Sequence, residues 1–344
     1  MPAKLRFHAG PATLVALAVI LAVALVAVVA LSGADAAAKQ LSCGETITAD
    51  TTLDSDLVDC PNNGIVIGAD DITLDLNGHR IEGDGTEFAD CSENEPCDVG
   101  VLNDGHDAIT IKDGTVIDFG PGVFLFRAKH SRLRELSTVE NAFNGIVLVR
   151  SSRNRIERST ASRNGMPNNF PGIALIESDH NRITNNRMSG NADLGLFMAA
   201  SDRNLIRHNK TSGHPEGGMI IEGDRNGIIR NRSAREGGGI LITIVDRGGK
   251  AVGNEIRGNE VRNARASGIA VDRGPKRTLV KGNHVVGSGR SGIIVGSPST
   301  TISDNRAVRN GRFGIEAVEG VIDGGGNRAR GNGRTHQCVN VKCR

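Results

Sequence analysis

A short motif returns along most of this 344-residue chain: a glycine followed by alternating aliphatic residues. The intervals between the glycines of successive copies run from 21 to 29 residues. The copies begin at Gly122, Gly145, Gly172, Gly195, Gly218, Gly239, Gly268, Gly292 and Gly314. A period of about 23 residues is too short for a pair of helices, so it favours a solenoid of stacked short strands.

Asparagine marks a second fixed position in the repeat. Two asparagines five residues apart bracket an aliphatic residue, as in Asn181-Arg-Ile183-Thr-Asn-Asn186. Each repeat therefore has room for three short strands and three turns, with aliphatic side chains of each strand pointing inward. Asparagines at equivalent turns of stacked coils both donate and accept hydrogen bonds, so they are able to form ladders. We therefore interpret the repeated asparagines as structural.

The repeat resembles the right-handed parallel β-helix of the pectate-lyase-like superfamily, in its carbohydrate-binding and sugar-hydrolase type. Matching motifs include Gly145-Ile146-Val-Leu followed by Asn154-Arg-Ile, and the resemblance covers about residues 65–332. It implies an all-β, right-handed parallel β-helix solenoid of about eleven coils, with three short strands per coil. Members of the superfamily include uronate lyases, glycoside hydrolases, uronate epimerases and phage tailspikes, so the fold alone selects no activity.

The first 36 residues have the pattern of a targeting segment. Lys4 and Arg6 precede an almost wholly apolar run at 12–31, and Ala34-Asp-Ala36 has the small-x-small form of a signal-peptidase site. The run is also long enough to span a bilayer, so an uncleaved N-terminal anchor, with membrane contact, is the alternative. After this segment we expect an N-terminal cap at 37–62, the β-helix at 63–336 and a disulfide-closed tip at 337–344.

Six cysteines support export, because disulfides persist in oxidising compartments. Their grouping towards the two ends of the chain favours three local pairs among the pairings that six cysteines allow. The expected disulfides are Cys43–Cys60, Cys91–Cys97 and Cys338–Cys343. We therefore expect a secreted or extracytoplasmic protein whose ends are pinned by disulfides.

Charge is unevenly distributed along the chain. Residues 37–120 carry 19 acidic and 3 basic side chains, whereas residues 121–344 carry 19 acidic and 36 basic ones. In the basic part, the residue after the second asparagine of most repeats is cationic and is expected to face outward. This basic row consists of Arg187, Lys210, Arg232, His284, Arg306 and Arg328, with Glu260 at the equivalent position of one repeat. The row is either a solvated surface or a binding track for a polyanion.

The scarcity of aromatic residues narrows the choice of ligand. The chain contains no Trp, no Tyr and 9 Phe. Neutral sugars are usually held by aromatic stacking, so recognition of uronate, phosphate or sulfate polymers by charge fits better. We expect an acidic polysaccharide or cell-wall polyanion as the partner, no nucleic acid and no required cofactor.

The outward positions of the predicted first strands are almost wholly apolar. They are Phe124, Val147, Ala174, Phe197, Ile220, Leu241, Ala270 and Ile294. An uncovered apolar row indicates a partner surface, here self-association, unless long turns such as Met166–Pro171 cover it. Uronate-acting members of the superfamily usually carry charged residues on this face, which argues against catalysis there.

The turn after the first strand holds the candidate catalytic residues. Aspartates recur there at Asp179, Asp202 and Asp224, and two adjacent repeats contain similar Val-Asp-Arg-Gly segments followed by a lysine. These segments supply two sets that would stack on each other: Asp246, Arg247 and Lys250, and Asp272, Arg273 and Lys276. Stacked carboxylates would act as acid and base, and the cations would bind a uronate carboxylate. The alternative is that the aspartates only cap their turns.

An acidic loop supplies a candidate calcium site at Asp90, Glu93, Glu95 and Asp98, because dense oxygen ligands suit Ca²⁺. A solvated acidic loop is the alternative. The sequence thus predicts an exported β-helix that binds an acidic polysaccharide or other polyanion, with lyase, hydrolase or uronate epimerase activity left open. The competing hypothesis is a non-catalytic structural or adhesin-like surface protein that assembles through its apolar strand face.

Overall fold

The computed structural model describes residues 41–86, 98–244 and 249–344. These residues form strands and turns, and no helix occurs among them. The described ranges therefore contain no helix that is long and apolar enough to cross a membrane. The targeting segment at 1–36 lies outside them, so its interpretation stays a prediction.

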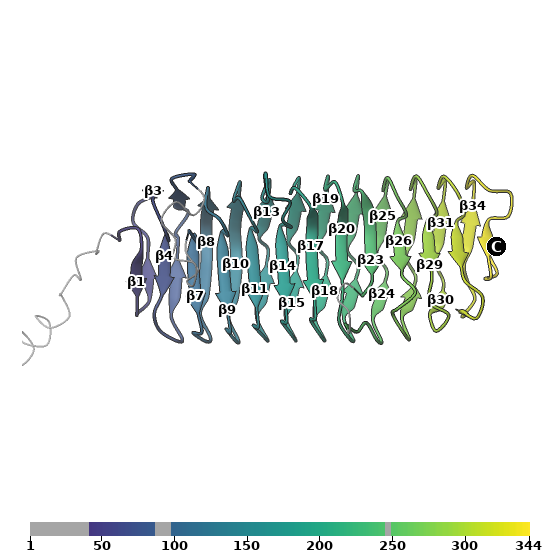
Figure 1. Cartoon of the computed structure of the whole chain (residues 1–344), viewed down its shortest axis with the longest axis horizontal. Coiled ribbons are helices and arrows are strands. Elements are labelled where there is room, and N and C mark those ends of the chain that lie inside the picture. The colour runs from purple at the N-terminus through teal and green to yellow at the C-terminus, as the bar shows by residue number, and fades with distance from the viewer. Residues whose placement is uncertain (1–40, 87–97, 245–248) are drawn as a thin grey trace, which may run out of the picture. The chain divides into compact units, whose positions relative to one another are not determined.

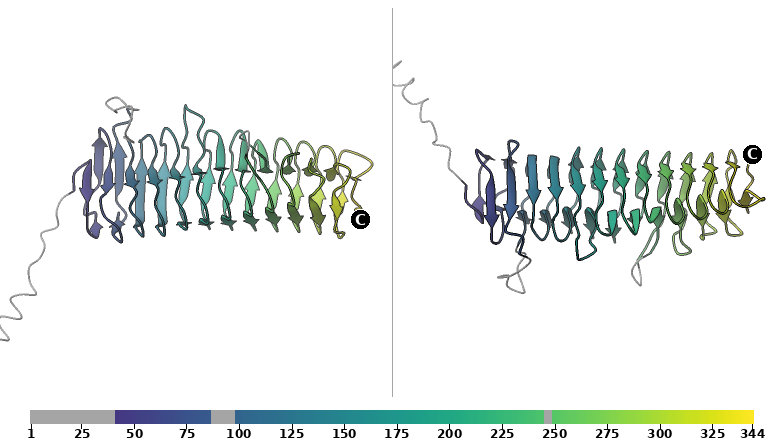
Figure 2. Two further views of the ribbon diagram at one scale, coloured as in Figure 1. Left: turned by 60° about the horizontal axis from the view of Figure 1, so that its bottom comes forward. Right: turned by 90° about the horizontal axis from the view of Figure 1, so that it is seen from above.

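The first strand of every coil belongs to one parallel sheet of 13 strands, sheet A, in which the strands follow chain order. Figures 1 and 2 show them stacked side by side, with β1 and the C-terminal coil at opposite ends. They are β1 (Glu45–Ile47), β4 (Ile65–Ile67), β7 (Val101–Asp104), β9 (Val123–Phe126), β11 (Ile146–Val149), β14 (Ile173–Ile176), β17 (Leu194–Ala199), β20 (Gly217–Ile221), β23 (Gly238–Ile242), β26 (Ile269–Val271), β29 (Ile293–Val295), β32 (Ile315–Ala317) and β35 (Cys338–Val339).

The second and third strands of the coils form the other sides of the solenoid, and they pair in parallel with equivalent strands of adjacent coils. The second strands are β2 (Thr51–Thr52), β5 (Thr73–Asp75), β12 (Arg155–Glu157), β15 (Arg182–Thr184), β18 (Leu205–Arg207), β21 (Gly227–Ile229), β24 (Glu255–Arg257), β27 (Leu279–Lys281), β30 (Thr301–Ser303) and β33 (Ile322–Asp323). The third strands are β3 (Leu57–Cys60), β6 (Arg80–Gly83), β13 (Thr160–Ser162), β16 (Arg187–Ser189), β19 (Lys210–Ser212), β22 (Arg232–Ala234), β25 (Glu260–Arg262), β28 (His284–Val286), β31 (Arg306–Val308) and β34 (Arg328–Arg330). In two coils a single strand, β8 (Thr110–Ile117) or β10 (Arg132–Val139), covers both sides.

Aliphatic side chains fill the interior, as the repeat predicts. In one coil, Ile173 and Leu175 of β14 and Ile183 of β15 are at most 1% exposed. The register places Ile173 between Ile146 and Leu196 of the adjacent coils, so the core continues from coil to coil. Each fully buried aliphatic side chain contributes about 1.5–3 kcal/mol relative to an exposed one.

Buried asparagines form a ladder at the corner between the second and third strands. Nδ2 of Asn186 donates to Oδ1 of Asn209 at 3.1 Å, and Nδ2 of Asn209 donates to Oδ1 of Asn231 at 3.1 Å. The members, all at most 1% exposed, are Asn186, Asn209, Asn231, Asn259, Asn283, Asn305 and Asn327. Their hydrogen bonds satisfy polar groups that would otherwise be buried without partners. The structural interpretation of the repeated asparagines is therefore confirmed.

The expected all-β parallel solenoid with three strands per coil is confirmed, and its coils extend further than the repeat motif indicates. Sheet A continues at both ends because β1 and β35 pair in parallel with β4 and β32. Two of the expected disulfides lie at these ends, Cys43–Cys60 and Cys338–Cys343, with Cα atoms 5.3 and 6.2 Å apart. Cys91 and Cys97 lie outside the described residues.

Removal of the Cys43–Cys60 disulfide by paired serine substitutions is expected to lower the free energy of unfolding by about 3 kcal/mol. The same change at Cys338–Cys343 should cost about 2 kcal/mol. The difference follows from the sequence separations of 17 and 5 residues, since a longer loop restricts the unfolded chain more. Guanidinium unfolding followed by circular dichroism measures both losses. Equal losses would show that loop length does not set the effect.

Candidate functional site

The basic row lies on the outer surface of the third strands, where the sequence predicts it. Parallel pairing aligns its members position by position from Arg187 in β16 to Arg328 in β34. All members are exposed except His284, which is half-buried. Adjacent members are about 4.8 Å apart along the solenoid, the spacing of neighbouring strands. The predicted binding residues therefore form one continuous line, interrupted by Glu260.

Most of the basic row has no acidic partner. Arg232 pairs through Nε with Oε2 of Glu260 at 3.2 Å. Across the described ranges, no ion pair involves the four other Arg and Lys members of the row, Arg187, Lys210, Arg306 and Arg328. The row therefore presents a positive surface that the protein itself does not neutralise.

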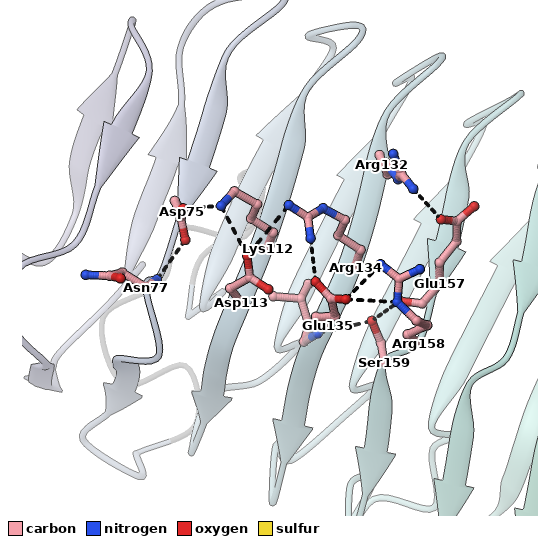
Figure 3. A network of polar contacts seen from close by, with 11 residues as sticks. Asp75, Asn77, Lys112, Asp113, Arg132, Arg134, Glu135, Glu157, Arg158 and Ser159 are labelled. Atoms are coloured by element: carbon pink, nitrogen blue, oxygen red, sulfur yellow. Dashed lines mark hydrogen bonds and ion pairs between the residues drawn. The ribbon is translucent and has the colours of Figure 1, made fainter.

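The N-terminal coils have the opposite arrangement, as Figure 3 shows. Nζ of Lys112 in β8 donates to Asp113 at 3.1 Å, and Arg134 in the next coil lies 3.7 Å from the same carboxylate. Nε of Arg158 donates to Glu135 at 2.9 Å, and Glu135 also pairs with Arg134. Basic side chains are neutralised within this network. The uncompensated cations of the row therefore belong to the later coils.

Two depressions follow the basic row. One, of about 380 Å³, is lined by Lys210 and Arg232, by polar residues of their coils, and by Glu260 of the next coil. The other, of about 490 Å³, lies over β25, β28, β31 and β34, and we call it the C-terminal depression. It is lined by Arg262, His284, Val286, Arg306, Val308, Arg309, Arg330 and Gly331. The basic row thus passes through two concave surfaces.

The predicted stacking of the two catalytic segments is wrong for the lysines. Lys276 pairs with Val252, not with Lys250, because the turn after β23 is longer than the turn after β26. Asp272 is exposed, and its Oδ2 accepts a 2.6 Å hydrogen bond from Thr243 Oγ1 in the adjacent coil. Of the other candidates, Arg273 and Lys250 are exposed, while Asp246 and Arg247 lie outside the described residues. The catalytic role of these residues stays a prediction.

The recurring turn aspartates cap the backbone of the following coil. Oδ1 of Asp179 accepts a 2.7 Å hydrogen bond from the backbone N–H of Asp202. Asp202 accepts one of 2.7 Å from Asp224, and Asp224 accepts one of 2.7 Å from Val252. Carboxylates used in this way hold the turns in place. The capping interpretation therefore applies to these three aspartates.

Asp98 is the one predicted calcium ligand among the described residues. Its side chain is 3% exposed, and Oδ2 accepts a 2.9 Å hydrogen bond from the backbone N–H of Gly120. Asp90, Glu93 and Glu95 lie outside the described residues. Within the described ranges, no three His, Cys, Asp or Glu side chains form a group suited to a metal ion. The calcium site stays a prediction.

The apolar first-strand row is aligned as predicted but is partly covered. Val147 and Ala174 are 4% and 2% exposed, and the remaining members are half-buried. Part of the row forms the floor of a cavity of about 580 Å³ on sheet A, which we call the sheet A groove. Its floor consists of Ile220, Leu241, Ala270 and Ile294. The apolar face is therefore hollowed at one place along its length.

Charged side chains rim the sheet A groove where its strands begin. They are Glu216 before β20, Arg265 before β26 and Arg290 before β29. Nη2 of Arg265 donates to the carbonyl oxygen of Pro215 at 2.6 Å, which holds the guanidinium at the rim. Asp193 precedes Glu216 by one coil, and its carbonyl oxygen accepts a 3.1 Å hydrogen bond from the Glu216 N–H. Burial, and then the charge of Glu216, raise the pKa of Asp193.

The corner beside the groove interrupts a second asparagine ladder. Nδ2 of Asn164 donates to Oδ1 of Asn191 at 3.0 Å, but the next two coils place His214 and Glu236 at this position. Both side chains are fully buried, and Nδ1 of His214 lies 3.0 Å from Oε2 of Glu236. The ladder resumes at Asn310 and Asn332. Because burying an ionisable pair costs more than burying amides, the break requires an explanation beyond packing.

Sequence reasoning missed the sheet A groove. Its charged rim residues come from three coils, are up to 74 positions apart and share no motif. One usable signal lies at the position that Asn164 and Asn191 occupy in their coils. The next two coils have His214 and then Glu236 at this position instead of asparagine. A second signal was the glycine run that starts at Gly237, where a Cβ atom would collide with the carbonyl oxygen of Pro215. Both features lie in coils that line the groove.

Comparison with known proteins agrees with the architecture. Residues 166–307 and 252–335 match the family model described as right handed beta helix region. No curated protein sequence matches the chain. The catalytic unit of a GH87 alpha-1,3-glucanase from Streptomyces thermodiastaticus superposes with a TM-score of 0.65 and 14% identity, covering 85% of this chain and 63% of that chain.

Two further solved structures are similar. DFA-IIIase from Arthrobacter chlorophenolicus, without its lid, gives a TM-score of 0.53 and 13% identity, covering 76% of this chain and 68% of that chain. The A-module of mannuronan C-5 epimerase AlgE4 from Azotobacter vinelandii gives 0.52 and 15%, covering 82% of this chain and 77% of that chain. At such low identity the likeness concerns the fold. Strand order and register show that the chain folds as a parallel β-helix, and residues 166–335 of it match the right-handed β-helix model.

Proposed function

We propose that this protein binds an acidic polysaccharide, or another extended polyanion, along the basic row. The observation that carries the proposal is the alignment of cations, one in each coil except that of Glu260, most of which lack a carboxylate partner in the described chain. A polymer that lies parallel to the solenoid axis would place anionic groups opposite several coils at once.

Such binding relieves an internal repulsion. Two unit charges about 5 Å apart repel by somewhat under 1 kcal/mol at the dielectric constant of water. Salt screens exposed charges, so each contact contributes little and affinity comes from several contacts together. We therefore expect binding to weaken steadily as the salt concentration rises.

An acidic glycan fits the basic row better than a single-stranded nucleic acid. Proteins that bind single strands rely on aromatic side chains on which the bases stack, and this chain has no Trp and no Tyr. The similar β-helices include proteins named as a glucanase and a mannuronan epimerase, which supports a glycan as the ligand. The two end disulfides support a secreted or extracytoplasmic location.

The triple variant Arg187→Gln, Lys210→Gln and Arg232→Gln is expected to bind polygalacturonate or alginate roughly 10- to 100-fold more weakly. Each exposed contact contributes about 0.5–1 kcal/mol, and the three losses should add. The dependence of affinity on salt should also flatten. Isothermal titration at several salt concentrations measures both changes. The midpoint of unfolding should barely move, because these side chains are exposed.

The matched control is a triple glutamine variant of exposed arginines on the second strands, Arg155, Arg182 and Arg257. It removes the same charge from a different face of the solenoid. An equal loss of affinity in both variants would show that net charge alone matters and that no track exists. If the wild-type protein binds no polyanion and instead forms a concentration-dependent oligomer, assembly through the apolar face becomes the better hypothesis.

A second candidate function is cleavage of a glycan in the sheet A groove. The observation that favours it is the buried His214–Glu236 pair, which replaces the asparagine ladder in the turns next to the groove. Hydrogen bonds from these residues fix the turn that carries Glu216. Glu236 Oε2, for example, accepts a 2.8 Å bond from the backbone N–H of His214. A site that needs a precisely placed Glu216 would justify the cost of burying the pair.

Glu216, Arg265 and Arg290 at the rim, together with Asp193 one coil before Glu216, supply the chemistry for such a cleavage. Asp193, whose pKa is raised, retains a proton to higher pH and would protonate the glycosidic oxygen. Glu216 would act as the base or nucleophile, since paired carboxylates flank the scissile bond in most glycoside hydrolases. Arg265 and Arg290 would hold an anionic substituent of the sugar. The apolar floor would contact the hydrophobic faces of the sugar rings.

A further inference from the structure

The C-terminal depression contains more positive charge than the other depression along the basic row. Its lining of eight residues contains four arginines and one histidine and no carboxylate. Arg262 comes from β25, His284 from β28, Arg306 and Arg309 from β31 and its following turn, and Arg330 from β34. Four consecutive coils thus direct basic groups to one volume of about 490 Å³.

The arginines differ in how they are held. Arg262 pairs with Glu260 of the same strand, so its guanidinium is positioned by a neighbour outside the depression. Arg306, Arg309 and Arg330 are exposed and have no ion pair within the described ranges. Arg309 stands at a corner with a φ of 55°, and its backbone N–H donates to the carbonyl oxygen of Arg330 at 3.2 Å. The backbone bond keeps these two arginines beside each other.

The floor of the depression strengthens electrostatic interactions. Val286 and Val308 are both 8% exposed and lie between the charged side chains. Charges beside apolar surface interact more strongly than charges surrounded by water. Burial, followed by the charges of Arg306 and Arg262, lowers the pKa of His284, and Glu260 opposes this shift. A bound anion would act in the same direction as Glu260 and favour protonation of His284.

We propose that the C-terminal depression binds a compact, multiply charged oxyanion, namely a phosphate monoester or pyrophosphate group. Guanidinium groups donate two parallel hydrogen bonds to phosphate oxygens, and several arginines around one volume match a group that carries about two charges. The isolated carboxylates of a uronate polymer would not use all four arginines. The proposal deepens the proposed function, since His284 and Arg306 belong to both, but it does not require a polymer along the row.

Titration of the full chain with pyrophosphate tests this inference. Pyrophosphate should bind at least about tenfold more tightly than acetate at equal ionic strength, because only the former engages several guanidinium groups. The double variant Arg309→Gln and Arg330→Gln should lose about tenfold or more of that affinity. Neither residue belongs to the basic row. The control variant Arg203→Gln and Arg225→Gln removes two exposed corner arginines elsewhere and should bind pyrophosphate like the wild type.

A second readout follows His284 directly. Its imidazole proton resonances should shift on addition of pyrophosphate, and affinity should rise as the pH falls through the range below about 6.5. A His284→Asn variant should lack that pH dependence. Equal binding of pyrophosphate and acetate, or equal losses in the two double variants, would overturn the inference. Polymer binding by the triple variant of Arg187, Lys210 and Arg232 is measured separately. A failure of oxyanion binding in the C-terminal depression is therefore distinguishable from a failure of polymer binding along the basic row.

Discussion

Replacement of Asn186 by leucine is expected to lower the free energy of unfolding by about 3 kcal/mol. Asn186 Oδ1 accepts a 2.9 Å bond from the Ser159 N–H, and its Nδ2 donates to Ile156 O at 2.8 Å and to Asn209 Oδ1 at 3.1 Å. Leucine has a similar volume but forms none of these bonds. Each buried polar group that loses a partner costs about 1 kcal/mol or more.

The preceding residue provides a matched control. Asn185 is exposed, has a φ of 60° and makes no side-chain hydrogen bond within the described ranges. An Asn185→Gly change suits this left-handed conformation and should alter stability by less than about 1 kcal/mol. Denaturant unfolding of the two variants compares them directly. Equal stability of the two variants would contradict a structural role for the ladder.

Replacement of Glu216 by glutamine is expected to slow release of reducing ends from a cleavable glycan by about 10²- to 10⁴-fold. The loss follows if its carboxylate serves as base or nucleophile in the sheet A groove. Asp193→Asn should slow the reaction by a similar factor while stabilising the fold. The folded state raises the pKa of Asp193, so ionisation of this carboxyl disfavours folding above its unfolded pKa of about 3.8. The gain in stability should therefore grow as the pH rises from about 4.

The exposed turn residue Asp272 supplies the control for these activity measurements. Asp272→Asn should leave the rate unchanged, since Asp272 follows the end of β26, whereas Asp193 and Glu216 lie where their strands begin. If Asp272→Asn abolishes product release and Glu216→Gln does not, the turn after β26 is the active site. If neither wild type nor variants release product from any acidic glycan, cleavage in the groove is wrong and the binding hypothesis stands alone.

The fold follows from the sequence because the repeat specifies it redundantly. Ile156, Ile183 and Ile206 occupy the same buried position in successive coils, and each is preceded two residues earlier by a buried asparagine. Any one coil is ambiguous, but a position that repeats about every 23 residues identifies both the inward face and the corners. The basic row could be predicted for the same reason, since outward positions follow from inward ones by alternation.

The sheet A groove could not be predicted in the same way, because its charged residues do not occur at a repeated position. Glu216 and Arg265 come from turns of different length, and no periodicity relates them. Turn length also explains the wrong stacking of Lys250 on Lys276. Val252 and Lys276 pair with each other, but the segment between β23 and Val252 is five residues longer than the segment between β26 and Lys276. The two similar segments are therefore out of register. Motif similarity predicts stacking only where the intervening turns have equal length.

The separation between bonded residues has a consequence for how this chain reaches its fold. The ladder joins residues between 22 and 28 positions apart, as in Asn283–Asn305 and Asn231–Asn259. Relative to the length of the solenoid, this gives a contact order of about 0.08, a value typical of helical bundles rather than of all-β proteins. The slow event should be the pairing of the first two coils, after which each new coil adds to an existing edge. We therefore expect that adding whole coils to this solenoid would not slow the pairing of each coil with the preceding one during folding.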